Sequence, residues 1–227
     1  MVLRARGEEP EARAALAELC EIYWTPVFRF LRREGRNEDV SQDLTQEFFA
    51  KLLAGNGIAM IDPQKGRFRS YLLGALKHFL AEDRRNETRQ KRGGGAEIES
   101  IEDEEVSVIT PEIPDPSAMI SDPYFDRQWG IALMERGLRT VEATFRNSGR
   151  EAQFEVLKPW LVGDTENLSQ ASAAAQLGMT SGSIKVAIHR LRKEFGNAIR
   201  NEIEQTVSEP DAIADELRYL IEVVSME

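Results

Sequence analysis

Cationic and aromatic side chains are concentrated in one stretch of the sequence, Lys65 to Arg92, which reads KGRFRSYLLGALKHFLAEDRRNETRQKR. It contains nine Lys or Arg and three Asp or Glu, a charge of +6 inside a chain of net charge −10. The rings of Phe68, Tyr71, His78 and Phe79 are interleaved with these cations. Cations that pair with phosphates, beside rings that stack on unpaired bases, suit single-stranded nucleic acid. Because an acidic chain repels nucleic acid elsewhere, we expect binding to be local to this stretch.

A second group of residues predicts a helix-turn-helix between Leu168 and Ile199, where the sequence reads LSQASAAAQLGMTSGSIKVAIHRLRKEFGNAI. Ser169 is expected to cap a short helix of small residues, which Gly178 would end in a left-handed turn. Thr180 or Ser181 would cap the next helix. Small residues let two helices cross closely, as this motif requires. The inner side of the second helix would carry Ile184, Ile188 and Leu191.

The outer side of that second helix is cationic. Between Ser183 and Arg200 there are five Lys or Arg and one Glu. This charge favours DNA binding over the alternative, a helical hairpin with a solvated basic face. Since such a helix enters the major groove N-terminus first, the residues expected nearest base edges are Thr180, Ser181, Ser183, Lys185 and Val186. Those better placed for phosphates are Arg190, Arg192 and Lys193.

Hydrophobic periodicity is helical throughout, and no segment shows sustained strand alternation. We expect an all-α protein with two small helical domains, residues 1–92 and 122–227, joined by an acidic linker, residues 93–121. Glu97 to Asp126 contains ten acidic residues and no basic residue. Such a segment buries little apolar surface, so a mobile linker is favoured over an ordered loop. Thr25-Pro26 is expected to cap and restart a helix, and Asp122-Pro123 to begin one.

Other features narrow the functional class. Cys20 is the only cysteine, so no intrachain disulfide is possible, and a cytoplasmic location is expected. Together with the distant His78 and His189 it does not provide metal-ligand spacing, so we expect no metal and no cofactor. No apolar run approaches the roughly 18 residues of a membrane span, so membrane insertion is not expected.

Two cationic helical modules joined by a tether resemble bacterial sigma factors of the sigma-70 family, most closely the extracytoplasmic-function (ECF) subfamily. The likeness is carried by EDVSQDLTQEFFAKLL (Glu38 to Leu53), GRFRSYLLGALKHFLAEDRR (Gly66 to Arg85) and AAAQLGMTSGSIKVAIHRLRKEF (Ala173 to Phe195). The matching domains cover most of the chain outside the tether and the C-terminal tail. The resemblance implies region 2 and region 4 domains and a non-enzymatic role: directing core RNA polymerase to promoters. It also implies core polymerase, promoter DNA and an anti-sigma protein as partners.

In this family, region 2.2 docks on the clamp helices of the polymerase β′ subunit. Its counterpart here is the helix from Val40 to Leu53. An apolar stripe is expected to face the core with Val40, Leu44, Phe48 and Leu52. The resemblance assigns polymerase binding to a carboxylate and amide face formed by Asp39, Asp43, Gln46 and Glu47. Without the resemblance, a solvated helix face is the simpler interpretation.

The family's next loop and helix melt the −10 element and capture a flipped base. The matching positions are Gln64, Lys65, Arg67, Phe68, Arg69, Tyr71, Lys77, His78, Arg84 and Arg85. Phe68 and Tyr71 are alternatively core residues, and Phe79 is expected in the core. Tyr71 stands where family members often have Trp, and His78 where they often have Asn. The identity of any base that His78 contacts is therefore not determined. The alternative is that His78 is a surface histidine without a role in base recognition.

Region 4 of the family reads the −35 element and can touch the polymerase β flap. The matching positions are Thr180, Ser181, Ser183, Lys185, Val186, His189, Arg190, Arg192 and Lys193. A final amphipathic helix, Asp211 to Val224, is expected to pack on region 4 rather than bind a partner.

Two other functional classes are alternatives to this interpretation. An autonomous helix-turn-helix regulator would use the second module alone, with the first as a sensor or dimerisation domain. A hydrolase with paired carboxylates is disfavoured, although Asp39, Asp43 and Glu47 cluster at helical spacing. No nucleophile constellation accompanies them, and Gly93-Gly94-Gly95 is not followed by the Lys-Ser/Thr of a phosphate-binding loop.

Overall fold

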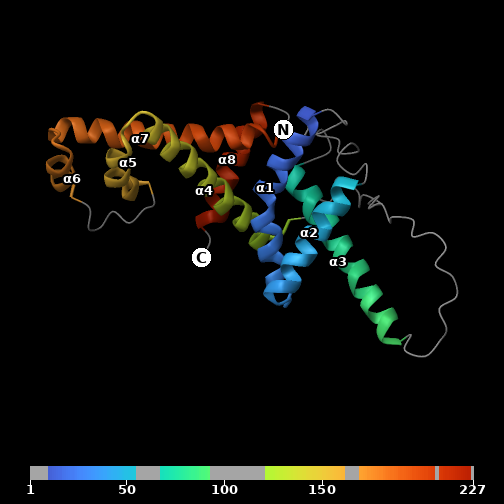
Figure 1. Ribbon diagram of the computed structural model, residues 1–227. Helices are drawn as coiled ribbons and strands as arrows, with labels where there is room; N and C mark the ends of the chain where they lie inside the picture. Colours follow the sequence, from blue (N-terminus) through green and yellow to red (C-terminus); the bar gives the residue numbers. More distant parts are fainter. Residues whose placement is uncertain (1–9, 55–66, 93–120, 162–168, 208–209, 226–227) are drawn as a thin grey trace. The chain divides into compact units, whose positions relative to one another are not determined.

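The computed structural model describes residues 10–54, 67–92, 121–161, 169–207 and 210–225, and this part of the chain is all-helical, as predicted (Figure 1). The described residues form eight α-helices and contain no β-strand. The first four are α1 (Pro10–Arg33), α2 (Glu38–Ala54), α3 (Phe68–Arg92) and α4 (Pro123–Asn147). They are followed by α5 (Glu151–Leu157), the 3₁₀ turn η2 (Lys158–Trp160), α6 (Gln170–Leu177), α7 (Ser181–Glu204) and α8 (Pro210–Ser225).

The chain forms two compact units. The first contains residues up to Ala132 and from Gln205 onward, and the second contains Leu133–Glu204. This division differs from the predicted 1–92 and 122–227 domains, because the start of α4 and the whole of α8 belong to the first unit. The predicted linker, residues 93–121, lies outside the described residues except for its last position.

Aromatic packing forms the core of the first unit. Tyr23 of α1 meets Phe68 of α3 edge-to-face with ring centroids 5.1 Å apart. Phe48 of α2 lies 5.7 Å from Phe79 of α3, which is buried as predicted. Phe30 of α1 meets Phe125 of α4 at 6.0 Å, which docks the start of α4 on the bundle. Each ring contact joins a different pair of helices, so these rings fix α1 to α4 together.

Helix α1 runs through Pro26 without the predicted restart. A proline inside a helix costs about 3 kcal/mol. Leu19, Tyr23 and Val27 are all buried on the same side of α1, before and after the proline. Burial of this continuous apolar face offsets the proline, because each fully buried side chain of this kind contributes about 1.5–3 kcal/mol.

Helix α2 follows the predicted apolar stripe with one correction. Leu44, Phe48 and Leu52 are buried, but Val40 is 37% exposed and the hydroxyl residues Ser41 and Thr45 are buried instead. Thr45 donates from Oγ1 to the carbonyl oxygen of Ser41 at 2.6 Å, so its buried hydroxyl is satisfied within the helix.

Helix α4 begins as predicted. The Asp122 carboxylate accepts a hydrogen bond from the Phe125 backbone N–H at 3.0 Å, with Pro123 in the first turn. Five apolar residues along it are buried: Phe125, Trp129, Leu133, Val141 and Phe145. The next helix, α5, ends at Leu157, where Pro159 turns the chain into η2.

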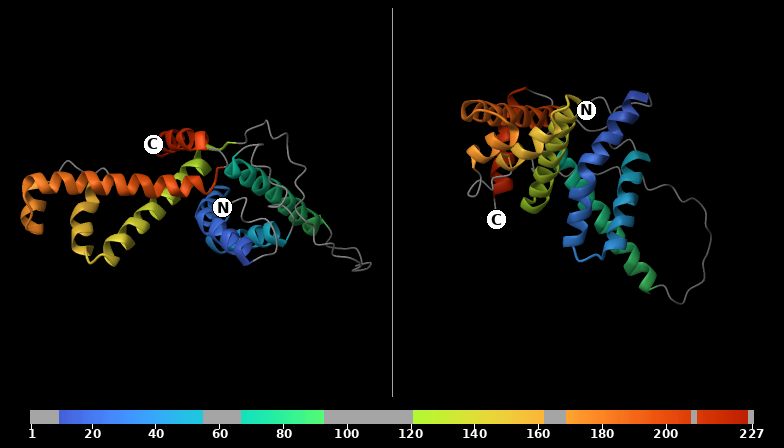
Figure 2. Two further views of the ribbon diagram at one scale, coloured as in Figure 1. Left: turned by 90° about the horizontal axis from the view of Figure 1, so that it is seen from above. Right: turned by 60° about the vertical axis from the view of Figure 1, so that its left-hand side comes forward.

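The C-terminal helix α8 packs in the first unit, whereas packing on region 4 was expected. Ile213, Leu220 and Val223 are buried. Gly130 of α4 allows the approach, since a Cβ atom there would lie 2.7 Å from Cγ2 of Val224. Figures 1 and 2 show α8 beside the first turns of α4. The final amphipathic helix was therefore identified correctly, but its partner was not.

Phe48→Ala should lower the free energy of unfolding of the first unit by about 3–5 kcal/mol, because it removes a fully buried ring that packs between α2 and α3. Leu53→Ala on the same helix, at a side chain 44% exposed, should change it by less than about 0.5 kcal/mol. Urea denaturation followed by circular dichroism measures both. Equal losses would contradict the placement of α2.

Candidate nucleic-acid interface

The helix-turn-helix of the second unit is formed by α6, a turn at Gly178, and α7. Ser169 caps α6, accepting on Oγ from the Ser172 N–H at 3.2 Å. Gly178 ends α6 with φ of +62°, in the left-handed region that glycine adopts at least cost. Thr180 caps α7 by accepting from the Ser183 N–H at 3.2 Å. The predicted caps and turn are confirmed, with Thr180 rather than Ser181 as the cap.

A small core holds these two helices on α4 and α5. Ala173 and Ala174 of α6 are buried, and their small side chains let α7 pack closely against α6. The inner face of α7 is also as predicted, with Ile184, Ile188 and Leu191 buried. They join a cluster that includes Phe145 of α4 and Phe154 of α5. The inner face of α7 is thereby fixed, and its outer face is free to contact a ligand.

Every predicted −35 residue is exposed: Thr180, Ser181, Ser183, Lys185, Val186, His189, Arg190, Arg192 and Lys193. Val186 is 50% exposed, which is unusual for a valine in a packed helix and suits contact with a base methyl group. Arg192 differs from the others because its guanidinium donates from Nε and NH2 to the Trp160 carbonyl oxygen, at 3.3 and 3.2 Å. Arg192 therefore holds η2 against α7, which reduces its availability for a phosphate.

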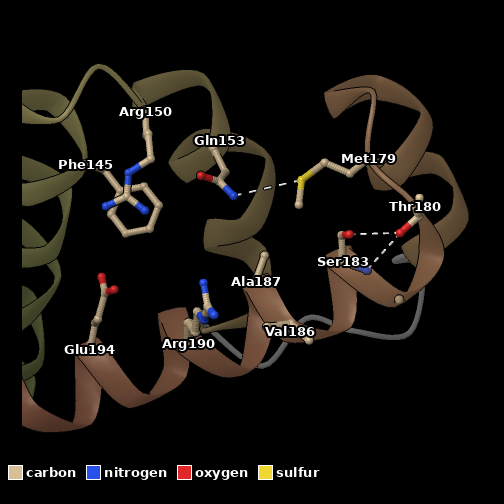
Figure 3. A pocket seen from close by; sticks show the side chains of 11 residues that line it. Phe145, Arg150, Gln153, Met179, Thr180, Ser183, Val186, Ala187, Arg190 and Glu194 are labelled. Atoms are coloured by element: carbon tan, nitrogen blue, oxygen red, sulfur yellow. Dashed lines mark hydrogen bonds between the residues drawn. The ribbon is translucent and has the colours of Figure 1, made fainter.

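A hollow of about 520 Å³ opens beside the N-terminal half of α7, lined from α7, the end of α4 and the start of α5 (Figure 3). Its cations are Arg150 and Arg190, and its polar groups include Gln153, Thr180 and Ser183. Arg150 lies over the Phe145 ring, 4.4 Å from its centroid, and donates from Nε to Ser148 Oγ at 2.9 Å. Glu194 also faces the hollow, so its charge is +1 from two arginines and one glutamate.

Arg150 and Gln153 were not among the predicted site residues. Gln153 lies on α5 and Arg150 is the residue directly before that helix, both outside the helix-turn-helix, and the packing of α5 against α7 brings them beside Arg190. The one sequence signal was Gly149, whose φ of +69° turns the chain directly before Arg150. The Arg150 guanidinium, fixed in place in the hollow that Thr180 and Ser183 also line, is suited to bind a phosphate next to α7.

The predicted −10 residues fall into four groups. Gln64 and Lys65 lie outside the described residues. Phe68 and Arg69, each 4% exposed, are inside the first unit, where no base or phosphate reaches them in this conformation. Arg67 and Tyr71 are half-buried, and burial raises the pKa of the Tyr71 hydroxyl. The residues on the surface are Lys77, His78, Arg84 and Arg85.

Arg69 was predicted at a DNA-binding surface, but it is buried, and its ion pairs explain why. Its guanidinium forms ion pairs with Asp126 of α4, at 3.2 Å, and with Glu216 of α8. The Trp129 and Tyr219 rings lie 4.6 and 4.5 Å from its central carbon. A buried charge is stable only when paired, and two carboxylates satisfy it here. Both partners are far from Arg69 in sequence, so neither was visible in the local pattern.

The outward face of α3 keeps part of the predicted cationic surface. Lys77, His78 and Arg85 are exposed, and the seven-residue step from His78 to Arg85 places these two on the same side of the helix. His78 Nδ1 lies 3.8 Å from a Glu82 carboxylate oxygen. Arg84 is less available, because it pairs at 2.7 Å with Glu34, the residue directly after α1. Lys77 and Arg85 are therefore the predicted −10 cations on this face that remain available to a ligand.

The four predicted polymerase-binding residues of α2 are brought together on one surface. Asp39, Asp43, Gln46 and Glu47 are all exposed, opposite the buried stripe of the same helix. Glu47 forms an ion pair with Lys51, 2.8 Å away and one turn later. Leu53, 44% exposed, follows Gln46 by seven residues and adds an apolar group to the same face.

Comparisons with protein families, curated proteins and solved structures found no match to this chain. Within the described ranges, no helix combines the length and apolar character needed to cross a membrane. Nor do the described residues contain a cluster of three or more His, Cys, Asp or Glu arranged to hold a metal ion. The assignment of function therefore rests on the surfaces described above.

Gly178→Ala should destabilise the second unit by about 1–2 kcal/mol, because a Cβ atom is disfavoured at φ of +62°. The same change at Gly196, a helical position of α7 with nothing within 4 Å of a Cβ, should stabilise it by about 0.5–1 kcal/mol. Thermal denaturation of the two variants measures this opposite sign. Loss of stability in both variants would contradict the turn geometry.

Proposed function

We propose that the protein is a promoter-specificity subunit of bacterial RNA polymerase, similar to sigma factors of the ECF type. The observation that carries this proposal is the capped helix-turn-helix, whose inner face is fixed by a core and whose outer face is exposed and cationic. The proposal further assigns −35 binding to the second unit and −10 binding to the first. It adds no catalytic step of the protein's own.

Recognition of duplex DNA is assigned to α7. Its N-terminus would enter the major groove, placing Ser183, Lys185 and Val186 against base edges. Arg190 and Lys193, further along the helix, would bind phosphates, and Arg150 across the hollow extends this contact to α5. Phosphate contacts fix the register of the helix, and the base-edge contacts then discriminate the sequence.

Attachment to core polymerase is assigned to the exposed acidic face of α2. Carboxylates on one helix form charge-assisted hydrogen bonds with a basic partner helix, and the neighbouring Leu53 would add buried apolar area. Once α2 is bound to the polymerase, Lys77 and Arg85 on the outward face of α3 would contact the backbone of the melted strand. Two weak DNA contacts joined through one assembly bind more tightly than either alone.

An autonomous helix-turn-helix regulator is the second candidate, and one observation favours it. Arg67 and Arg69 of the first unit are engaged by carboxylates, whereas the outer face of α7 is open. On that candidate the second unit alone would bind DNA, and core polymerase would not be a partner.

Pull-down with core RNA polymerase, followed by run-off transcription on genomic fragments, tests the first candidate. The double variant Asp43→Ala, Glu47→Ala should lose core binding by at least about tenfold, because hydrogen bonds to charged groups contribute about 1.5–3 kcal/mol each. It should keep binding of the isolated protein to duplex DNA. Glu18→Ala, which removes an exposed carboxylate of α1, is the control and should change neither. No core binding by the unaltered protein would favour the autonomous regulator.

The double variant Arg190→Ala, Lys193→Ala should show the reverse pattern. Duplex binding should weaken by at least about tenfold, and the slope of log affinity against log salt should fall by about two, one for each phosphate contact. Arg139→Ala, which removes an exposed cation from α4 in the same unit, is the matched control. Titrations at several salt concentrations measure both quantities. An unchanged salt slope would contradict the assignment of these two residues to phosphates.

A further inference from the structure

The C-terminal helix α8 covers the cations at the start of α3. One carboxylate, that of Glu216, binds both of them: its Oε1 lies 2.7 Å from Nε of Arg67, and its Oε2 accepts from NH1 of Arg69. The Glu216 side chain is 2% exposed. Two guanidinium groups on the two oxygens of one buried anion form the arrangement that also binds a phosphate.

The surrounding groups complete this arrangement. Tyr219 of α8 lies under both guanidinium groups, with its ring centroid 5.3 Å from Arg67 and 4.5 Å from Arg69. Its hydroxyl donates to Asp126 Oδ2 at 2.5 Å. The two arginines and the two carboxylates, Asp126 and Glu216, sum to zero charge. While α8 is in place, this part of the first unit therefore presents no net cation to nucleic acid.

We propose that α8 is an intramolecular latch, in which Glu216 occupies a phosphate-binding pair formed by Arg67 and Arg69. This proposal rests on the proposed function, because the pair lies at the start of the helix assigned to the melted strand. With α8 docked, strand binding by the free protein is suppressed. When α8 leaves, Arg67 and the rings around it become available to a single strand.

The charges favour this direction. Within the described residues, Glu216 is the carboxylate partner of Arg67, so release of α8 frees that cation. Arg69 keeps Asp126, at 3.2 Å, and remains paired. The exposed surface thus gains one positive charge without leaving an uncompensated charge inside the unit. A nucleic acid phosphate then replaces the carboxylate, which is an exchange of one anion for another rather than the creation of a new buried charge.

The close crossing at Gly130 gives a way to displace α8 without touching any charged group. Gly130→Leu would place a side chain where a Cβ atom alone lies 2.7 Å from Val224 and 3.1 Å from Leu220. Glu216→Gln is the complementary variant, because it removes the charge and keeps the shape. Asp215→Asn is the matched control, since it removes a carboxylate that is 63% exposed from the same helix.

The experiment measures binding of a labelled single-stranded oligodeoxynucleotide to the full-length free protein at low salt. Gly130→Leu and Glu216→Gln should each bind at least fivefold more tightly than the unaltered protein, whereas Asp215→Asn should change affinity by less than twofold. Adding Arg67→Ala to either variant should abolish the gain. Thermal unfolding of each variant is recorded in parallel.

Three outcomes would overturn the latch. An equal gain in Asp215→Asn would attribute the effect to net charge. Cooperative loss of the first unit in both Gly130→Leu and Glu216→Gln, with no gain in binding, would make α8 a constitutive part of the core. Unchanged binding in folded variants would leave the arginine pair without a role in nucleic acid binding. Because the assay contains no polymerase, its failure is distinguishable from failure to bind core polymerase.

Discussion

The first unit depends on one buried cation. Arg69 lies where α3, α4 and α8 meet, with a carboxylate from each of the last two helices and an aromatic ring from each. A buried charge is stable only when it is paired, and the two carboxylates together compensate this one. An apolar cluster tolerates small sliding of helices, but a guanidinium held by two carboxylates does not. Arg69 therefore specifies the position at which α8 docks.

The second unit is organised differently, through local contacts. Its two caps and its left-handed glycine lie within a few residues of the helices that they begin or end. Its core consists of small and branched side chains from consecutive helices. The surface that faces a ligand is thus separated from the residues that determine the fold. In the first unit the two roles overlap, because cations near the predicted strand-binding site also hold the helices together.

This difference explains what the sequence could predict. Helix caps, the turn at Gly178 and the inner face of α7 depend on near neighbours, and all were identified from residue type and spacing. The role of Arg69 depends on Asp126 and Glu216, 57 and 147 positions away in the chain, and no local pattern carries that pairing. The same holds for α8, whose apolar face was recognised but whose partner helix was not. Val40 was predicted on the buried stripe, but Ser41 and Thr45 are buried in its place. The Thr45 hydroxyl is satisfied within the helix and the Ser41 side chain is small, and hydropathy alone does not anticipate either effect.

The exposure of Val186 on α7 has a consequence for how this protein can change. Val186, His189 and Lys193 touch solvent rather than the interior, so their replacement leaves the scaffold beneath almost unaffected. On the proposed function, preference for a DNA sequence would therefore change by single codon changes, without compensating repacking. The same exposure makes α7 a helix whose outer face can be redesigned in the laboratory without altering the core.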